Sequence, residues 1–185
     1  MRKLILSYLE GKVMNDVKDF GKYTVKNVKS FMGREGYGFN CSLYRDGKKV
    51  GSCIDDAGGG GMYPIDWDMK IDRKHEQTLF DAHIKSLPAV ASSFGKKDMT
   101  LTIDEGWFVT ELVNKWEQGK EVRKVKRKCA QKTLYRTLDQ NDGSYFVSNI
   151  LFSPEVGRKL RAKYGDKIEI FNEVFEKGSI PSVLS

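Results

Sequence analysis

A cationic stretch in the second half of the chain is the feature best suited to bind a ligand. Residues 120–136 carry eight cationic side chains and one acidic one, a local charge of +7 that equals the formal net charge of all 185 residues. The cations are Lys120, Arg123, Lys124, Lys126, Arg127, Lys128, Lys132 and Arg136. The rest of the sequence is electrically balanced, so the basicity is local. A concentrated positive patch favours an anionic partner and steers it by long-range attraction.

The apolar residues within this stretch predict how its cations are presented. Val122, Val125 and Cys129 follow the i, i+3, i+7 spacing of a helix, which would leave most of the cations facing solvent. A strand would instead place cations on both faces. Either arrangement holds several charges within ~10 Å, about one Debye length at physiological salt. Phosphates would relieve their repulsion, and Tyr135 and Tyr145 could stack on bases. An acidic protein partner and a solvated face with no partner are the alternatives.

A group of aspartates around a glycine run is the second candidate for chemistry. The four carboxylates are Asp55, Asp56, Asp66 and Asp68, and they flank the sequence Ala-Gly-Gly-Gly-Gly. On a strand, Asp66 and Asp68 face the same way. With a third carboxylate from across the loop they could hold Mg²⁺ or Mn²⁺ for a nuclease or phosphotransferase. The alternative is that they form turns and caps, with no metal or other cofactor bound. The glycine run itself lacks the spacing of a phosphate-binding loop.

The cysteines and histidines do not form a recognisable metal site. Cys41, Cys53 and Cys129 lack metal-ligand spacing, as expected of scattered thiols in a reducing compartment. His75 and His83 are eight residues apart on one predicted helix, about 12 Å along its axis, so they cannot share a metal. We expect His83 in a core. A Cys129 thiol activated by neighbouring cations is a further alternative.

The clearest structural signal is a hairpin in the first half of the chain. The dipeptide at 46–47, Asp-Gly, joins two apolar-patterned runs and suits a two-residue turn. That register predicts Leu43 opposite Val50. It also places Cys41 and Cys53 on opposite faces of the sheet, where they could not form a disulfide without distortion.

Other elements follow from local patterns. In the first half we expect a short helix or edge strand within 3–20, a strand at 23–32, an edge strand at 62–67 and a helix capped by Asp72 that ends near Leu87. In the second half we expect a helix with a Thr102–Glu105 capping box that is stopped by Gly119, and a hairpin around 141–143. A helix from Ser153 to Gly165, a strand at 168–175 and a loose tail from 176 complete the chain. Strands that come in hairpins rather than βαβ units predict an α+β fold, with mainly antiparallel hairpins packed with three or four helices. Two lobes are expected, 1–95 and 96–185, or one continuous domain.

Composition narrows the class of protein. Hydrophobic residues make up 39% of the chain, enough for a real core. No stretch approaches the ~18 apolar residues of a membrane span. The apolar run before Glu10 is too short for a signal peptide. We therefore expect a cytoplasmic protein without a membrane partner.

The hairpin and glycine loop also resemble a class of known proteins. The residues Gly38-Phe39-Asn40, Leu43 to Lys48, Asp55-Asp56 and the glycine run resemble small uncharacterised accessory proteins of bacteriophages and plasmids. The resemblance implies an accessory role in the host cell, directed at nucleic acid, a host enzyme or a defence complex, and it carries no functional residue. The leading hypothesis is a non-enzymatic protein that docks nucleic acid or an acidic host nucleoprotein complex. A metal-dependent enzyme and an inhibitor directed purely at protein are the alternatives.

Overall fold

The protein has an α+β fold built from antiparallel sheets and helices, as predicted. A computed structural model describes residues 2–5, 20–88, 90–91, 100–101, 103–139 and 143–184. The chain divides into two compact units, residues 11–117 (the central unit) and residues 1–10 with 118–185 (the terminal unit). The two units meet between residues 117 and 118, whereas the sequence predicted a boundary at 95/96. The observed boundary lies inside a continuous helix, which contributes side chains to both cores.

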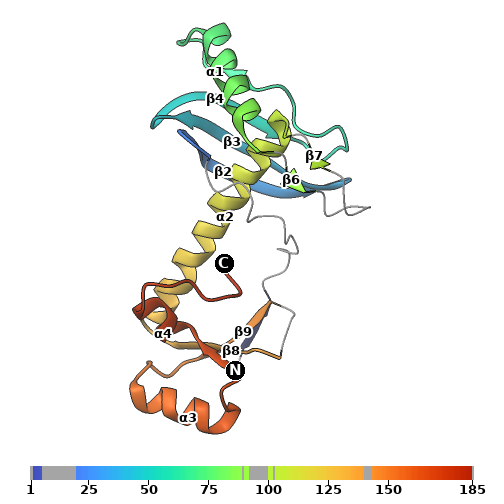
Figure 1. The fold of residues 1–185 in the computed structure, drawn as a ribbon. Helices are drawn as coiled ribbons and strands as arrows, with labels where there is room; N and C mark the ends of the chain where they lie inside the picture. Colours follow the sequence, from blue (N-terminus) through green and yellow to red (C-terminus); the bar gives the residue numbers. More distant parts are fainter. Residues whose placement is uncertain are drawn as a thin grey trace. The chain divides into compact units, whose positions relative to one another are not determined.

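The central unit is a four-stranded antiparallel sheet with both of its helices on one face (Figure 1). Its elements are β2 (Tyr23–Gly33), β3 (Gly36–Arg45), β4 (Lys48–Asp55), β5 (Asp66–Trp67), α1 (Arg73–Ser86) and the first half of α2 (Glu105–Cys129). A short pair, β6 (Val90–Ala91) and β7 (Thr100–Leu101), is separate from this sheet. The core joins sheet residues to Phe80 of α1 and Phe108 of α2, whose ring centroids are 5.5 Å apart.

The central hairpin turns where the sequence predicts, but its register is different. Asp46 and Gly47 both have positive φ, as a tight turn requires. Beyond the turn a β-bulge shifts the pairing, so Leu43 lies opposite Gly51 instead of Val50. Val50 stays buried because the bulge absorbs the extra residue. The prediction that Cys41 and Cys53 face opposite sides is therefore wrong, since the shift pairs them directly.

Helix α1 begins as predicted, whereas α2 differs at its start and in its length. Asp72 caps α1 by accepting a hydrogen bond from the backbone N–H of His75. Asp104 takes the corresponding role for α2 by accepting from Trp107 N at 2.7 Å. Thr102 of the predicted capping box lies outside the described residues. Gly119 does not stop α2, which runs on to Cys129, because helix-forming residues surround a single glycine.

Replacing Gly119 by Ala is expected to stabilise the protein. Gly costs a helix interior about 0.5–1 kcal/mol relative to Ala. A methyl group at 119 would approach only the flexible end of Arg123, at 3.2 Å. We expect Gly119→Ala to raise the free energy of unfolding by about that amount in urea denaturation. Gly157→Ala in helix α3 (Pro154–Tyr164) is the control, because its methyl group would meet Glu173 at 2.9 Å and should bring no gain. Equal stabilisation by both would contradict the prediction.

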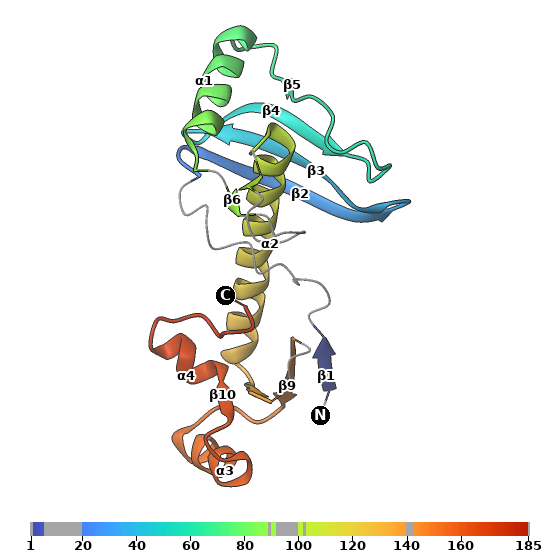
Figure 2. The same cartoon turned by 45° about the vertical axis from the view of Figure 1, so that its right-hand side comes forward.

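The terminal unit is a second antiparallel sheet with helices on both faces (Figure 2). Its strands, in spatial order, are β1 (Arg2–Ile5), β9 (Ser144–Ser148), β8 (Thr133–Thr137) and β10 (Ile168–Ile170). On one face lie α3 (Pro154–Tyr164) and the stacked rings of Tyr135 and Phe146. On the other, Leu134 packs with the second half of α2 and with α4 (Phe171–Glu176).

The predicted boundaries hold best at the start of this unit and least at its end. The expected β8–β9 hairpin is present, although residues 140–142 of its turn lie outside the described part. Ser153 caps α3 and Gly165 ends it, as predicted. The expected strand at 168–175 gives way to helix α4 after Ile170. The tail is not loose, because Leu184 is buried in the core and Ser182 donates hydrogen bonds to Glu169. No helix among the described residues is long and apolar enough to cross a membrane.

Candidate nucleic-acid interface

The second half of α2 is anchored by one apolar side. Val125 is fully buried and Val122 and Cys129 are partly buried, all packed against the core of the terminal unit. Gln118, on the same side, donates a hydrogen bond to the carbonyl oxygen of Leu184. The predicted apolar spacing is thus confirmed in a helix, and the strand alternative is wrong. The opposite side of this segment is left open to solvent.

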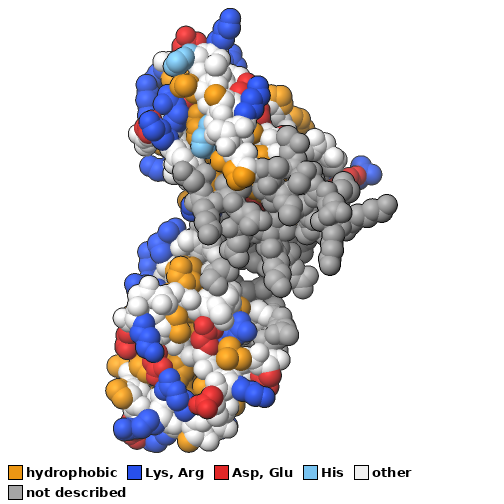
Figure 3. Space-filling model, in the orientation of Figure 1, with side chains coloured by type: hydrophobic (Ala, Val, Ile, Leu, Met, Phe, Trp, Pro, Cys, Tyr) orange, Lys and Arg blue, Asp and Glu red, His pale blue; other side chains and the backbone are white. Residues whose placement is uncertain are grey.

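Four cations share the open side of α2 and define what we call the cationic face. Lys120, Arg123, Lys124 and Arg127 are all exposed and follow the i, i+3, i+4, i+7 spacing of one helix face. The first and last of them are seven residues apart, about 10 Å along the axis at 1.5 Å per residue. Lys126 is also exposed and flanks the face. Figure 3 shows Lys and Arg side chains along the edge of the molecule beside α2.

The sequence around the cationic face supplies one acidic side chain. Glu121 is the only carboxylate in 120–136, and it pairs with Lys124 at 3.0 Å. That pair is solvent-exposed on the lysine side, so salt and water weaken it. No ion pair of Arg123 or Arg127 occurs among the described residues. Arg127 and the flanking Lys126 lie in the last turn of α2, where they also offset the negative end of the helix dipole.

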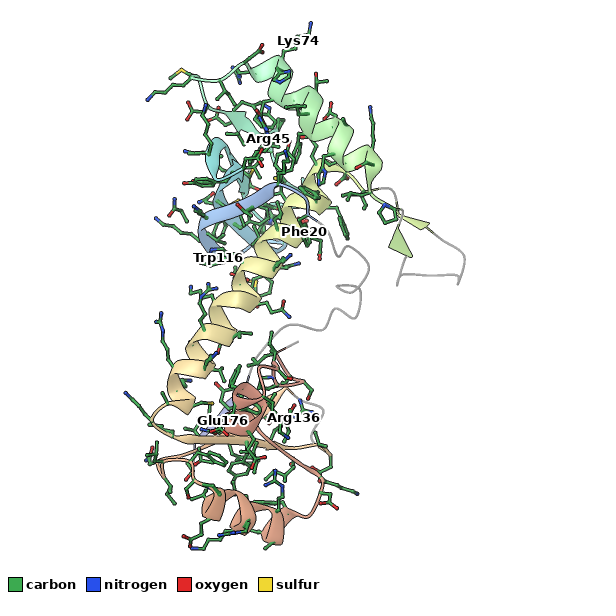
Figure 4. All side chains as sticks on the ribbon, turned by 60° about the vertical axis from the view of Figure 1, so that its left-hand side comes forward. Phe20, Arg45, Lys74, Trp116, Arg136 and Glu176 are labelled. Carbon is green, nitrogen blue, oxygen red and sulfur yellow. The ribbon has the colours of Figure 1, made fainter. Side chains whose placement is uncertain are left out.

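Three predicted site residues do not join the cationic face. Arg136 lies on β8 rather than on α2 (Figure 4), with its side chain only 13% exposed and 3.9 Å from the Glu169 carboxylate. Lys128 turns inward and donates a hydrogen bond to the Tyr145 hydroxyl at 3.3 Å. Lys132 follows the helix in the turn before β8 and is partly buried. The predicted group of eight therefore reduces to the four cations of the face and the flanking Lys126.

The expected aromatic contribution to binding is also absent from this surface. Tyr135 and Tyr145 are 1% and 2% exposed, so neither ring can stack on a base. Burial raises the pKa of Tyr145 to about 12, which keeps its hydroxyl neutral. Both rings are core residues of a sheet whose two faces are covered by helices. The suggestion of base stacking by these tyrosines is wrong.

The four aspartates serve turns and strand ends and do not form a shared site. Asp55, Asp56 and Asp68 each accept a hydrogen bond from a backbone N–H two residues later. Asp56 also accepts one from the Tyr63 hydroxyl at 2.6 Å, which lowers its carboxyl pKa. Asp66 is on β5, opposite Ser52. Within the described part of the chain, no three acidic, histidine or cysteine side chains are placed to hold a metal.

Cys129 and His83 are the remaining candidates for chemistry, and both pack against core residues. Burial raises the pKa of the Cys129 thiol to about 11, so the neighbouring cations do not activate it. His83 packs against the rings of Tyr23 and Phe108, with centroids 5.3 and 5.4 Å away, but it is only partly buried and no hydrogen bond to its Nε2 occurs among the described residues. Sequence reasoning missed Asn172, a buried residue of α4 that hydrogen-bonds the C-terminal end of α2. Asn172 stands between Phe171 and Glu173, and one polar residue there carries no periodic signal that would mark it as buried.

Comparison with known proteins supplies no relative. No family model matches the chain, and neither a curated protein nor a solved structure is significantly similar to it. The resemblance to accessory proteins of phages and plasmids therefore stays an expectation. Any functional conclusion has to come from the cationic face and its surroundings.

Proposed function

We propose that the protein is a non-enzymatic nucleic-acid-binding protein that contacts the phosphate backbone through the cationic face of α2. One observation carries the proposal: four cations lie on one exposed side of a helix whose other side is fixed in a core. A fixed helix presents its charges without first having to be ordered, so binding does not incur that entropy cost. The face and the flanking Lys126 hold five cations beside one carboxylate, Glu121, a formal net charge of +4.

The chemistry of the face favours contacts to phosphate over contacts to bases. Its side chains are lysine and arginine, which bind phosphate oxygens and can also contact guanine, and segment 119–130 contains no Asn or Gln that could read an adenine edge. Phosphate contacts position a protein without reading sequence. Binding is therefore proposed to be independent of sequence and strongly dependent on salt. The scattered aspartates give no comparable support to a metal-dependent nuclease.

The biological setting is proposed on the resemblance given above. An accessory protein of a phage or mobile element would act in the host cytoplasm, on nucleic acid or on a host nucleoprotein or defence complex. A nucleic-acid tether would bring it to any of these targets. Capture from host lysate with and without nuclease treatment separates indirect from direct protein partners. Partners held through nucleic acid are lost after digestion, and direct protein partners remain.

Removing the cationic face is expected to abolish most of the binding. The test variant combines Lys120→Gln, Arg123→Gln, Lys124→Gln and Arg127→Gln. Each phosphate contact adds about 0.9 to the slope of log affinity against log salt on duplex DNA. The slope should fall by about 3–4 if all four residues contact phosphate, and affinity at low salt by at least about 100-fold. Fluorescence anisotropy with labelled duplexes of unrelated sequence measures both.

A matched control separates this face from net charge. Arg158→Gln, Lys163→Gln, Lys167→Gln and Lys177→Gln remove the same charge from exposed positions elsewhere in the terminal unit. This control should keep the wild-type slope to within about one contact. Circular dichroism and thermal melting establish that both variants are folded. Equal losses in the two quadruple variants, or wild-type affinity in the first, would overturn the proposal.

A further inference from the structure

Two buried cysteines face each other across the central hairpin. Cys41 of β3 and Cys53 of β4 are direct partners in the antiparallel register, and they are 5% and 1% exposed. Both side chains lie in the hydrophobic core of the central unit. The β-bulge between Leu43 and Tyr44 creates this pairing, since the unshifted hairpin would place Cys53 on the other face.

The register gives the two cysteines a separation that a disulfide can span. Opposed residues of antiparallel strands have Cα atoms about 4.5–5.5 Å apart. Disulfides join Cα atoms about 4.4–6.8 Å apart, so the backbone already lies in range. Their Cβ atoms, at about 4.5–5.5 Å, need only a small approach to reach bonding distance. The third cysteine, Cys129, belongs to the terminal unit and has no such partner.

We propose that Cys41 and Cys53 form a reversible dithiol–disulfide site in the core of the central unit, with a small-molecule disulfide as the oxidant. The sulfur of Cys41 loses its proton and attacks one sulfur of the oxidant, which releases one thiolate and leaves a mixed disulfide. The deprotonated sulfur of Cys53 then attacks the Cys41 sulfur and releases the second thiolate. Two protein thiols are oxidised to one disulfide, and the oxidant is reduced to two thiols.

The surroundings of the two thiols suggest their order of reaction. Cys41 is the more exposed, 5% against 1%, and the neighbouring Cys53 lowers its pKa, whereas Cys41 and burial both raise the pKa of Cys53. Cys41 is thus the attacking residue and Cys53 the resolving one. Because both are buried, the oxidant reaches them only when the hairpin opens locally, so the reaction is slow in the native protein. The site is independent of the nucleic-acid proposal, because the cationic face belongs to the other unit.

Oxidation of the full chain in glutathione buffers tests this site. The reduced protein is equilibrated over a range of ratios of oxidised to reduced glutathione, quenched with acid, alkylated in denaturant and weighed. We expect a form with one alkylated cysteine, Cys129, and a non-reduced digest that joins the peptides of Cys41 and Cys53. The bond closes a loop of a dozen residues, so melting of the central unit should rise by about 5–10 °C.

Single substitutions provide the controls. Cys129→Ser should oxidise like the wild type, whereas Cys41→Ala should form no internal disulfide. If the Cys41 variant fails to fold, the digest of the wild-type protein still decides the pairing. Three alkylated cysteines at every buffer ratio would overturn the proposal. A bond that includes Cys129, or one that forms only in denaturant, would also overturn it.

Discussion

Replacing Asn172 with Ala should destabilise the terminal unit by about 3 kcal/mol and fray the end of α2. The side chain is 5% exposed and makes three hydrogen bonds at once. Its oxygen accepts from Leu134 N at 3.0 Å, and its amide donates to the carbonyl oxygens of Cys129 and Lys132, each at 2.9 Å. Truncation leaves three backbone groups without this partner. Each unsatisfied buried group costs about 1–3 kcal/mol, less where water enters.

Asn172→Asp is the sharper variant, because it keeps the shape of the side chain. The carboxylate can still accept from Leu134, but it faces two carbonyl oxygens with no hydrogen to donate. We expect it to cost at least as much as Ala at neutral pH, and less when acid protonates it. Urea denaturation of the three proteins measures the order. An Asp variant as stable as the wild type would show that the amide donors contribute nothing.

The same substitution links stability to the proposed function. Cys129 is the last residue of α2, and its carbonyl is one of the helix-end groups that lack a partner within the helix. Once that end frays, the nearby cations of 120–127 lose their fixed presentation. We therefore expect weaker nucleic-acid binding from Asn172→Ala even though no charge is removed. The slope against salt should change less than in the quadruple variant, because all four cations remain.

Local patterns in the sequence predicted the elements that depend on local chemistry. Asp72 and Ser153 as caps, the turn at 46–47 and the apolar side of α2 each follow from a few neighbouring residues, and the structure confirms them. Fold class followed from the same signals, because hairpins and helices of these lengths combine in few ways.

Features set by distant contacts were not predictable in this way. The bulge that pairs the two central cysteines depends on keeping Val50 buried as well as Gly51. Asn172 has partners about 40 residues earlier in the chain, so no spacing announces it. Gly119 does not end α2, because the low helix propensity of one glycine counts for less than the packing of both halves of the helix. Of the predicted binding residues, Arg136 was misjudged because its partner Glu169 comes from another strand.

An ion pair in the central unit should produce the other large effect. Arg45 at the end of β3 reaches the α1 carboxylate of Glu76 with two hydrogen bonds, at 2.5 and 2.9 Å, and lies between the sheet and α1 (Figure 4). Glu76 is 4% exposed, whereas the Arg45 side chain is 28% exposed. Removing either partner should cost about 2–4 kcal/mol, below the cost for a fully buried pair because Arg45 retains contact with water.

The two single variants should differ in stability, because each leaves a different charge without its partner. Glu76→Gln leaves a guanidinium that can turn toward solvent. Arg45→Met leaves a buried carboxylate with no partner, so it should be the more destabilising at neutral pH. The exposed pair of Glu155 and Lys159 in α3 is the control, and Glu155→Gln should change stability little. Equal costs in the two core variants would mean that burial of the carboxylate is not the dominant effect.

The dependence on pH gives the strictest test of this pair. Hydrogen bonding to Arg45 lowers the folded-state pKa of Glu76, so its stabilisation is full above the unfolded value of about 4.3 and is lost as pH falls through the folded pKa. The stability gap between wild type and Glu76→Gln should therefore narrow in acid.

In Arg45→Met, burial without a partner should raise the pKa of Glu76 above 4.3. The carboxyl then destabilises the variant increasingly as pH rises from about 4 to 6. Urea denaturation across this range should show the gap between wild type and Arg45→Met widening with pH. A gap that stays constant would contradict the assignment of the ion pair as a buried, hydrogen-bonded contact.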